Sequence, residues 1–468
     1  MTAPPARPPG PKGSPVLGSL PDFARDILGY MTHCAKEYGD IVYLRLAGWE
    51  VFQLNHPDLI DVVLREKREN FVKHRFFWRH VTAIFGNGLL TSEGDFWLRQ
   101  RRLAAPAFHP DRIAAYGDVM VRYAERLADG WQDGEVRDIH REMMKVTMEI
   151  VSKALFDADV ERDVEEVGDA FEVVLKEIGV RFRRPFRISD ALPTPGNLRY
   201  RRGVAIVNRV INRIVAERRA RPADRGDLLS TLMSARDDDG AAMSDAQLRD
   251  ELVTLFLAGH ETTAIVLSWT WHLLAQHPLV RDRLVAELFD ELERRPAGVA
   301  DLPRLPYVDA VLKESIRLYP PAYVLGREAV ADCEIGGWQI PAGATLYMSP
   351  WVLHRDARWF ASPEKFLPER WLDGLASRLP RFVYFPFGGG PRVCIGDRFA
   401  TMEAALILAT LARRFRFERT SEAEIVPLPS ITLRPQGGVP LKLVRRQPQS
   451  PLPAQDAEGD LRETPSAG

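Results

Sequence analysis

Residues 387–396 read FGGGPRVCIG and place a single cysteine, Cys394, on a glycine-rich loop before a long apolar run. Three consecutive glycines let the backbone turn tightly around the sulfur. The run at 395–412 is predicted to form a helix, and the start of a helix presents unpaired N–H groups and partial positive charge. These donors favour the thiolate form of the cysteine over the thiol. A thiolate in this position can hold an iron ion.

A lone cysteine in an arbitrary sequence more often simply packs in the core. A packing cysteine, however, needs neither Phe387 nor three glycines nor the basic Arg392 two residues before it. The pattern resembles the haem-binding loop of the cytochrome P450 family, the haem-thiolate monooxygenases. The resemblance implies a mainly α cytochrome P450 fold, with a large helical domain and a small β-rich subdomain. It also implies haem b with its iron on Cys394, and Phe387 and Gly396 beside the cofactor.

Composition fits a large soluble enzyme with no global charge. The 63 basic and 64 acidic residues leave a formal charge of -1, which favours neither nucleic acid nor an anionic membrane as partner. Three scattered cysteines predict a reducing, cytoplasmic location. No apolar stretch long enough for a membrane anchor is recognised. We expect a Pro/Gly-rich segment at 1–20, a single haem domain at 21–446 and a disordered tail at 447–468.

Most of the chain carries helical spacing. Residues 41–46 and 51–54 alternate in hydrophobicity and are predicted to form a hairpin. Helices are expected from about 57 to 319, with breaks at 86–88, 193–196 and 237–240, and short strands at 330–348 and 425–444.

A second motif, AGHETT at 258–263, interrupts an apolar helical run that a capping box at Ser244 is predicted to open. From local rules alone, Thr262 could bond back to the carbonyl four residues earlier and Glu261 could face solvent. The motif resembles the oxygen-activating helix of the family, in which Gly259 opens room for dioxygen, Thr262 hydrogen-bonds the oxygen and Glu261 relays protons. His260 is interpreted as a paired or solvated side chain and not as a metal ligand.

A third motif joins two distant segments. Glu314 and Arg317 are spaced three apart on a predicted helix, as are residues 291 and 294, which are interpreted as a solvated helix face. In the family, the glutamate and arginine of this motif form a buried cluster with a later arginine, which is Arg370 here. These three residues are given structural roles. Trp371 stands where the family usually has phenylalanine, a departure expected to be unimportant.

The two propionates of haem need cationic or N–H donors. Trp97 and Arg101 lie four residues apart, on one face of a predicted helix. That helix could equally be an ordinary amphipathic helix with surface arginines, and the adjacent Arg102 could compete with Arg101. By resemblance, Trp97, Arg101, Arg327 and Arg392 bind the propionates.

The resemblance implies a monooxygenase that inserts one oxygen atom from O2 into an apolar molecule. Electrons would come through a separate ferredoxin or flavodoxin and an NAD(P)H-dependent reductase to a monomeric enzyme. A patch of Arg99, Arg102 and Arg398 is a hypothetical docking site for an acidic carrier. The substrate class stays open between fatty acid, terpenoid, steroid and polyketide, and Arg75 or Arg79 could anchor a carboxylate or face solvent.

Three other functions are possible for a chain with this cysteine loop. A peroxide-driven hydroxylase (peroxygenase) or an isomerase of the same family usually lacks the acid–alcohol pair Glu261–Thr262. A non-enzymatic haem-binding sensor would need no proton relay and usually has a signalling domain, for which no sequence remains.

Overall fold

A computed structural model describes residues 7–157, 161–183, 192–221, 225–293 and 295–446. The predicted disordered tail at 447–468 lies outside these residues. The helices are α1 (Leu20–Arg25), α2 (Ile27–Tyr38), α3 (Pro57–Asp61), α4 (Arg75–Phe85), α5 (Gly94–Ala104), α6 (Pro110–Ala115), α7 (Gly117–Asp129), α8 (Ile139–Phe156), α9 (Glu161–Arg183), α10 (Pro195–Ala220), α11 (Leu228–Ser234), α12 (Asp245–Gln276), α13 (Pro278–Leu292), α14 (Pro306–Leu318), α15 (Pro350–Leu353), α16 (Leu375–Arg378) and α17 (Asp397–Arg414).

The strands are short and scattered along the chain. They are β1 (Ile41–Leu46), β2 (Trp49–Leu54), β3 (Phe71–Lys73), β4 (Val136–Asp138), β5 (Leu325–Ala329), β6 (Cys333–Ile335), β7 (Trp338–Ile340), β8 (Thr345–Met348), β9 (Phe415–Arg419), β10 (Pro427–Pro429), β11 (Leu433–Pro435) and β12 (Pro440–Arg445).

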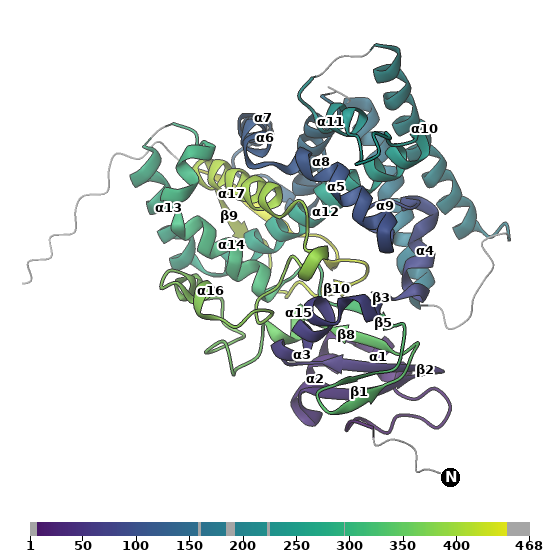
Figure 1. Cartoon of the computed structure of the whole chain (residues 1–468). Helices are drawn as coiled ribbons and strands as arrows, with labels where there is room; N and C mark the ends of the chain where they lie inside the picture. The colour runs from purple at the N-terminus through teal and green to yellow at the C-terminus, as the bar shows by residue number, and fades with distance from the viewer. Residues whose placement is uncertain (1–6, 158–160, 184–191, 222–224, 294, 447–468) are drawn as a thin grey trace, which may run out of the picture.

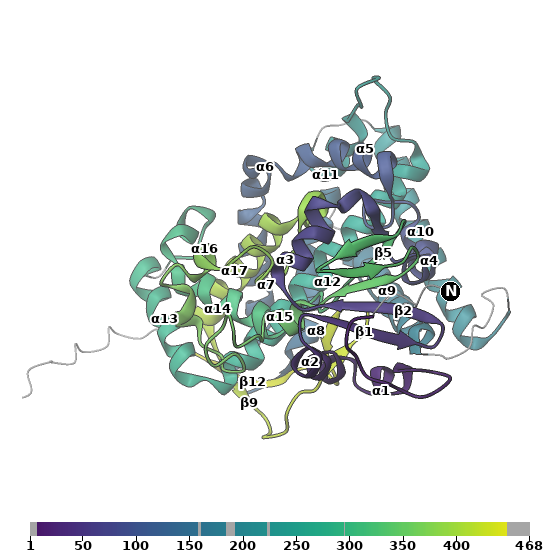
Figure 2. The same cartoon turned by 60° about the horizontal axis from the view of Figure 1, so that its bottom comes forward.

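The predicted hairpin is confirmed as the antiparallel pair β1 and β2, although β2 begins two residues earlier than expected. The largest sheet has the order β1-β2-β8-β5-β3, so strands from both ends of the chain meet in it. Figure 1 shows this sheet apart from the helices α13, α14 and α16, and Figure 2 turns it toward the viewer. Strands β3 and β4 fall inside the stretch predicted to be helical. Three-residue strands carry no period of their own, because their pairing partners come from far along the chain.

Helix α12 runs through the middle of the helical region and packs against α8, α10, α14 and α17 (Figure 1). Half of the predicted capping box is present at its start: the hydroxyl of Ser244 accepts a hydrogen bond from the N–H of Gln247 at 3.3 Å, while the side chain of Gln247 accepts from Arg99. By length and composition α12 could cross a membrane, but 83% of its most apolar window is buried inside the fold. A helix that is apolar all round is typical of the core of a large domain.

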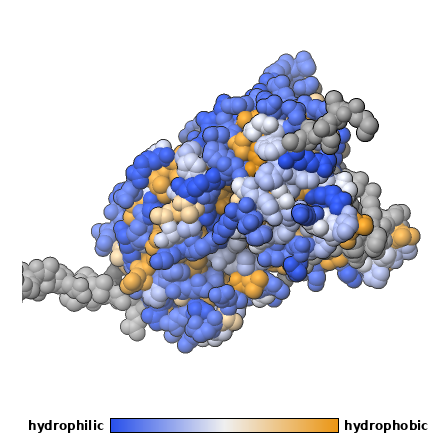
Figure 3. Space-filling view, turned by 90° about the horizontal axis from the view of Figure 1, so that it is seen from below, coloured by the Kyte–Doolittle hydropathy of each residue, from blue (hydrophilic) through white to orange (hydrophobic). Residues whose placement is uncertain are grey.

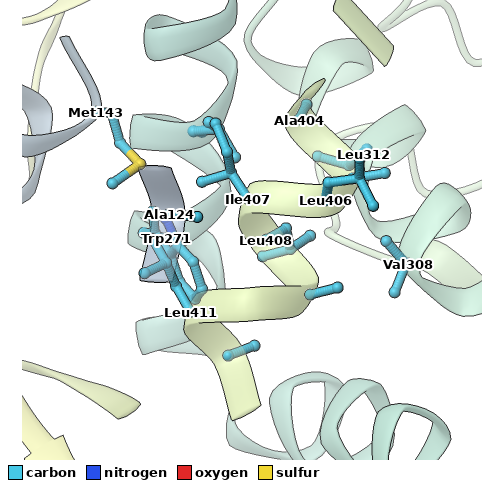
Figure 4. Packing of buried hydrophobic residues seen from close by; sticks show 14 of the residues in the cluster. Ala124, Met143, Trp271, Val308, Leu312, Ala404, Leu406, Ile407, Leu408 and Leu411 are labelled. Atoms are coloured by element: carbon cyan, nitrogen blue, oxygen red, sulfur yellow. The ribbon is translucent and has the colours of Figure 1, made fainter. Parts of the chain in front are cut away.

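Helix α17, which follows the cysteine loop, is the second core helix. Figure 4 shows Leu406, Ile407, Leu408 and Leu411 of α17 packed toward side chains of α14, α12 and α8, among them Trp271. Burial of such side chains contributes roughly 1.5–3 kcal/mol each to folding. The cysteine loop therefore leads into a rigid element.

The face of the molecule seen in Figure 3 is mainly hydrophilic, and its apolar residues form small separate patches. The large apolar surfaces of the described residues are turned inward, into six core clusters.

Candidate active site

The cysteine loop is closed by its own backbone and by its neighbours. The N–H of Cys394 donates to the carbonyl of Phe387 at 2.9 Å, and α17 begins at Asp397 with Gly396 as its cap residue. Gly390 has a positive φ of 65°, and a Cβ there would lie 2.0 Å from the carbonyl oxygen of Leu64. Only glycine fits this conformation and this contact. The loop geometry predicted from the sequence is thus required by the packing around it.

The side chain of Cys394 is accessible, yet the surrounding protein desolvates it. Burial raises the pKa of the thiol, while the N–H of Gly396 and the charge of Arg101 lower it without reversing the shift. The N–H of Gly396 at the helix start favours the thiolate as predicted, but desolvation outweighs this donor in the chain without iron. A side chain that is accessible and desolvated at once lines an interior cavity.

One face of α12 also carries accessible residues inside the fold. Ala258 is exposed in a helix whose surrounding residues are buried, and Thr262, four residues later, is half-buried. The hydroxyl of Thr262 donates to the carbonyl of Ala258 at 2.9 Å, which is the local alternative weighed from the sequence. A Cβ on Gly259 would lie 2.8 Å from a methyl group of Val151, so glycine is needed here for the approach of α8. Its role in admitting dioxygen stays a prediction.

Glu261 forms a buried ion pair with Arg434. Its Oε1 accepts two bonds from Arg434, at 2.9 and 2.6 Å, and one from the hydroxyl of Thr432 at 2.6 Å. Burial raises the pKa of Glu261, but the charge of Arg434 and the bonds from both partners outweigh it and lower the pKa. The alternative from local rules, in which Glu261 could face solvent, does not hold, since its side chain is 4% exposed.

No local pattern marks Arg434 or Thr432 as partners of Glu261, because they lie more than 170 residues away in the sequence. His260 is buried, and its Nδ1 lies 3.0 Å from the carbonyl of Phe256. This contact agrees with the interpretation of His260 as a paired side chain.

The four residues assigned to the propionates lie around the cysteine loop. The guanidinium of Arg392 lies over the ring of Trp97, 4.2 Å from its centroid, and Arg101 donates to the carbonyl of Val393 at 2.7 Å. Arg327 is bonded to the carbonyl of Gly326 at 2.9 Å and, within the described part of the chain, to no carboxylate. Burial and the charge of Arg392 lower the pKa of Arg327 to about 10.

Two further charges belong to this group and were missed from the sequence. Lys73 is 8% exposed and pairs with Arg327 between β3 and β5. Glu93 binds Arg392 and accepts a bond from the N–H of Lys73 at 2.8 Å. Among the described residues, the only carboxylate bonded to a charged group of these four cations is that of Glu93, which binds Arg392; the side chains of Arg101 and Arg327 donate to backbone carbonyls. This surplus of positive charge, buried at Lys73 and half-buried at the three arginines, fits a ligand with two carboxylates, as haem has.

The other arginines considered from the sequence have partners already. Arg99 and Arg102 form ion pairs with Asp237 and Asp238, at 2.6 and 3.2 Å. The hypothetical docking patch is thus partly neutralised. Arg75 forms an ion pair with Glu328 at 3.4 Å, and the side chain of Arg79 lies outside the described residues.

Glu314, Arg317 and Arg370 come together as the resemblance implied. Arg317 donates two bonds to the carboxylate of Glu314, both at 2.8 Å, and Arg370 adds one at 3.0 Å. The remaining N–H groups of Arg317 donate to the backbone carbonyls of His354, Pro363 and Lys365. Glu314 and Arg317 are both 0% exposed.

Trp371 is also part of this cluster. Its indole N–H donates to Oε2 of Glu314 at 2.8 Å, from the short 3-10 turn Pro368–Trp371. The expectation that tryptophan at this position is unimportant is therefore wrong, because phenylalanine cannot make this bond. The departure from the family pattern was itself the signal that could have identified it.

Comparison with known proteins agrees with this geometry. The family model described as Cytochrome P450 matches residues 8–441. The chain is 37% identical to cyclooctatin synthase of Streptomyces melanosporofaciens, over 90% of this chain and 92% of that protein. It is 36% identical to cyclooctat-9-en-7-ol 5-monooxygenase of the same organism, over 92% and 93% of the two chains. Pentalenene oxygenase of Streptomyces avermitilis is 33% identical, over 94% and 97%.

These matches span nearly the whole chain and bear out the fold and the activity implied by the cysteine loop. The cofactor is haem b on a cysteine thiolate, and the reaction is monooxygenation of an apolar small molecule, with O2 and with electrons from redox partners. The chain belongs to the cytochrome P450 family.

Proposed function

We propose that this cytochrome P450 hydroxylates or epoxidises a cyclic terpenoid. Its relatives include proteins named for cyclooctat-9-en-7-ol and pentalenene. The half-buried apolar side chains near the cysteine loop support the proposal. Leu90, Ile395 and Ile431 pack against one core cluster, and Leu325 lies 4.0 Å from the Cβ position of Gly388. A cavity with such walls suits a substrate without charged groups.

The cofactor would be held from two sides. Cys394 would bind the iron, and Trp97, Arg101, Arg327 and Arg392 would hold the propionates. When bound, haem supplies the activation of dioxygen, while the protein supplies position and protons.

Thr262 and Glu261 would handle protons. The hydroxyl of Thr262 can exchange its bond to the carbonyl of Ala258 for a bond to a ligand in the cavity. The three bonds to Glu261 all end on Oε1, which leaves Oε2 for water. In this arrangement Glu261 takes protons from water, and Thr262 donates them at the substrate side.

A separate ferredoxin or flavodoxin would deliver electrons to a cytoplasmic, monomeric enzyme whose single haem domain spans 21–446. The position of Arg398 supports docking beside the cysteine loop, because it is exposed at the start of α17 and forms no ion pair with a described residue. Reversal of charge at Arg398 should lower the electron-transfer rate and weaken its dependence on salt. An unchanged rate and salt dependence would exclude this docking site.

The observation that carries the proposal is that Cys394 and Ala258 are accessible and Thr262 is half-buried, although Ala258 and Thr262 lie on the core helix α12. The test is binding and turnover of pentalenene and of palmitic acid by the haem-loaded enzyme, with a ferredoxin, its reductase and labelled O2. We expect pentalenene to change the haem absorbance and to gain one labelled oxygen atom. Binding and turnover of palmitic acid alone would contradict the terpenoid assignment.

The same assay tests the proton roles. We expect Thr262→Ala to keep haem and substrate binding and to divert most reducing equivalents to peroxide. Thr270→Ala is the matched control, because Thr270 makes the same back-bond in α12, to the carbonyl of Val266 at 2.8 Å, deep in the core. Equal coupling in the two variants would refute the role of Thr262.

A further inference from the structure

The carboxylate of Glu93, the residue before α5, joins the cysteine loop to strand β3. Its Oε1 accepts a hydrogen bond from the backbone N–H of Lys73 at 2.8 Å, and its Oε2 accepts one from the guanidinium of Arg392. Arg392 also donates to the carbonyl of Ser92 at 3.1 Å and lies over the ring of Trp97. Both oxygens of Glu93 are therefore bonded, and one of these bonds fixes the position of Arg392 beside the cysteine loop.

The cations near Glu93 repel one another. Lys73 lies directly opposite Arg327 in the antiparallel pair β3 and β5, and like charges opposite each other in a sheet are destabilising. Burial and the charge of Arg392 lower the pKa of both residues, to about 7 for Lys73 and to about 10 for Arg327. The charge of Glu93 counteracts the shift in each case, so Glu93 stabilises the charged form of both side chains.

Within the described part of the chain, no other acid is bonded to these cations. The guanidinium groups of Arg101 and Arg327 donate to backbone carbonyls, at 2.7 and 2.9 Å, and so does the ammonium group of Lys73. A haem propionate is also a carboxylate and needs the same donors. Glu93 therefore has the chemistry of a propionate, and it is bonded to Arg392 in the chain without haem.

We propose that Glu93 is a positioning residue that stands in for a haem propionate. In the haem-free chain it holds Arg392 against Trp97 and balances part of the positive charge. In the haem-loaded enzyme it is a third carboxylate near the same cations, so it weakens their attraction for the propionates and disfavours the negative charge that reduction adds to the iron. This inference rests on the proposed site of the propionates and not on the terpenoid substrate.

The test uses the haem-loaded enzyme and two substitutions at the start of α5. Glu93→Gln keeps the shape of the side chain and an oxygen that can accept from the N–H of Lys73, and it removes the charge. Asp95→Asn is the matched control, because Asp95 lies two residues further along, is exposed and forms no ion pair with a described residue. Transfer of haem to apomyoglobin measures the rate of haem loss, and spectroelectrochemical titration measures the midpoint potential of the iron.

In Glu93→Gln we expect haem to leave about tenfold more slowly, because Arg392 is no longer shared with a protein carboxylate. The equilibrium constant for reduction of the iron should rise about threefold, which is about 28 mV when a factor of ten is about 59 mV for one electron. Asp95→Asn should change haem loss by less than about twofold and leave the potential near that of the parent, since water and salt screen an exposed charge.

Haem loss from Glu93→Gln as fast as from the parent, or faster, would overturn the proposal, because Glu93 would then be an ordinary structural partner of Arg392. An unchanged midpoint potential would overturn the effect of its charge on the iron. Equal changes in Asp95→Asn would show that any acid at the start of α5 acts in this way, which would contradict a role for the bonded carboxylate.

Arg392→Gln separates this inference from the cofactor site on which it rests. This variant should lose haem faster than the parent, because it lacks a donor to a propionate. Faster loss here, combined with no effect of Glu93→Gln, would overturn the role of Glu93 alone. Unchanged loss in Arg392→Gln would exclude Arg392 from the propionate site, and the stand-in role of Glu93 would fall with it.

If Glu93→Gln does not fold, the double variant Glu93→Gln/Lys73→Met removes one charge of each sign. It should fold and bind haem, because the balance of charge is restored. A double variant that also fails to fold would contradict the proposal, since the bonds of Glu93 and not its charge would then explain why the chain needs it.

Discussion

Two clusters of charged side chains differ in whether the protein alone provides a partner for each charged group. In the cluster around Glu314, both carboxylate oxygens accept hydrogen bonds, which come from Arg317, Arg370 and Trp371. The guanidinium of Arg317 also donates to three backbone carbonyls. In the cluster around Arg327, only one of four cations, Arg392, is bonded to a carboxylate of the described residues, that of Glu93.

This difference separates a structural cluster from a binding site. A closed cluster is complete without a ligand, so its loss should damage the fold. An open cluster holds charge that the protein has not neutralised, so it weakens the haem-free fold and strengthens the bound one. The same distinction can be tested residue by residue.

The largest effect is expected from breaking the closed cluster. Glu314→Ala leaves Arg317 and Arg370 buried without their carboxylate, which should lower the free energy of unfolding by roughly 3–5 kcal/mol and prevent haem retention. Chemical denaturation and the haem content of the purified protein measure both effects.

Glu291→Ala is the control, since its spacing to residue 294 is the same, while its ion pair with Arg304 is long, at 3.7 Å, and exposed. The control should lose less than about 1 kcal/mol. Similar losses in both variants would mean that the buried cluster contributes no more to stability than an exposed ion pair.

A smaller loss is expected from Trp371→Phe, which restores the usual residue of the family. It removes the indole donor to Glu314 and should lower the free energy of unfolding by roughly 1.5–3 kcal/mol, as for hydrogen bonds to charged groups. Denaturant titration of the variant and the parent gives the value. A free energy of unfolding equal to that of the parent would show that tryptophan at position 371 is unimportant for stability, as expected from the sequence.

The Glu261–Arg434 pair is intermediate, because one carboxylate oxygen is satisfied and the other is open. Arg434 lowers the pKa of Glu261 below its usual 4.5, so the pair stabilises the fold above that pH and loses this effect as pH falls. In Arg434→Met, the burial that raises the pKa of Glu261 is opposed only by the hydroxyl of Thr432 and by His260, so the charged form of Glu261 loses its main stabilisation as pH rises.

The loss of stability caused by Arg434→Met should therefore be larger at pH 8 than at pH 4 by roughly 1–2 kcal/mol. Arg419→Met is the control, because its partner Glu422 is 94% exposed. A loss that does not change with pH would show that Arg434 does not set the ionisation of Glu261.

The smallest effect, with the opposite sign, is expected from the open cluster. Arg327→Met removes a half-buried cation that binds no carboxylate of the described residues and should stabilise the haem-free protein by about 1 kcal/mol, while haem leaves the loaded protein faster. Thermal unfolding without haem and transfer of haem to apomyoglobin measure the two effects. Destabilisation of the haem-free variant would show that Arg327 stabilises the fold without haem, as the residues of the Glu314 cluster are expected to do.

Residues in continuous motifs were predictable, and residues that act across the fold were not. Cys394, Thr262 and the pair Glu314–Arg317 lie in local patterns whose spacing carries chemical meaning. Lys73 and Arg434 lie on three-residue strands without a motif. Their roles depend on pairing with segments more than 170 residues away, which sequence periodicity does not encode.

By itself, the sequence determined the haem-thiolate family, the order of the motifs and the residue that binds the iron, because these depend on short segments with fixed spacing. Only the tertiary structure decided the partners of Glu261, the bond of Trp371 to Glu314 and the bond of Leu89 to Glu251. It also added the desolvation that raises the pKa of Cys394 against the donors at the helix start. Hydrogen bonds and desolvation are properties of what surrounds a group in space, and that environment is assembled only when distant segments pack together.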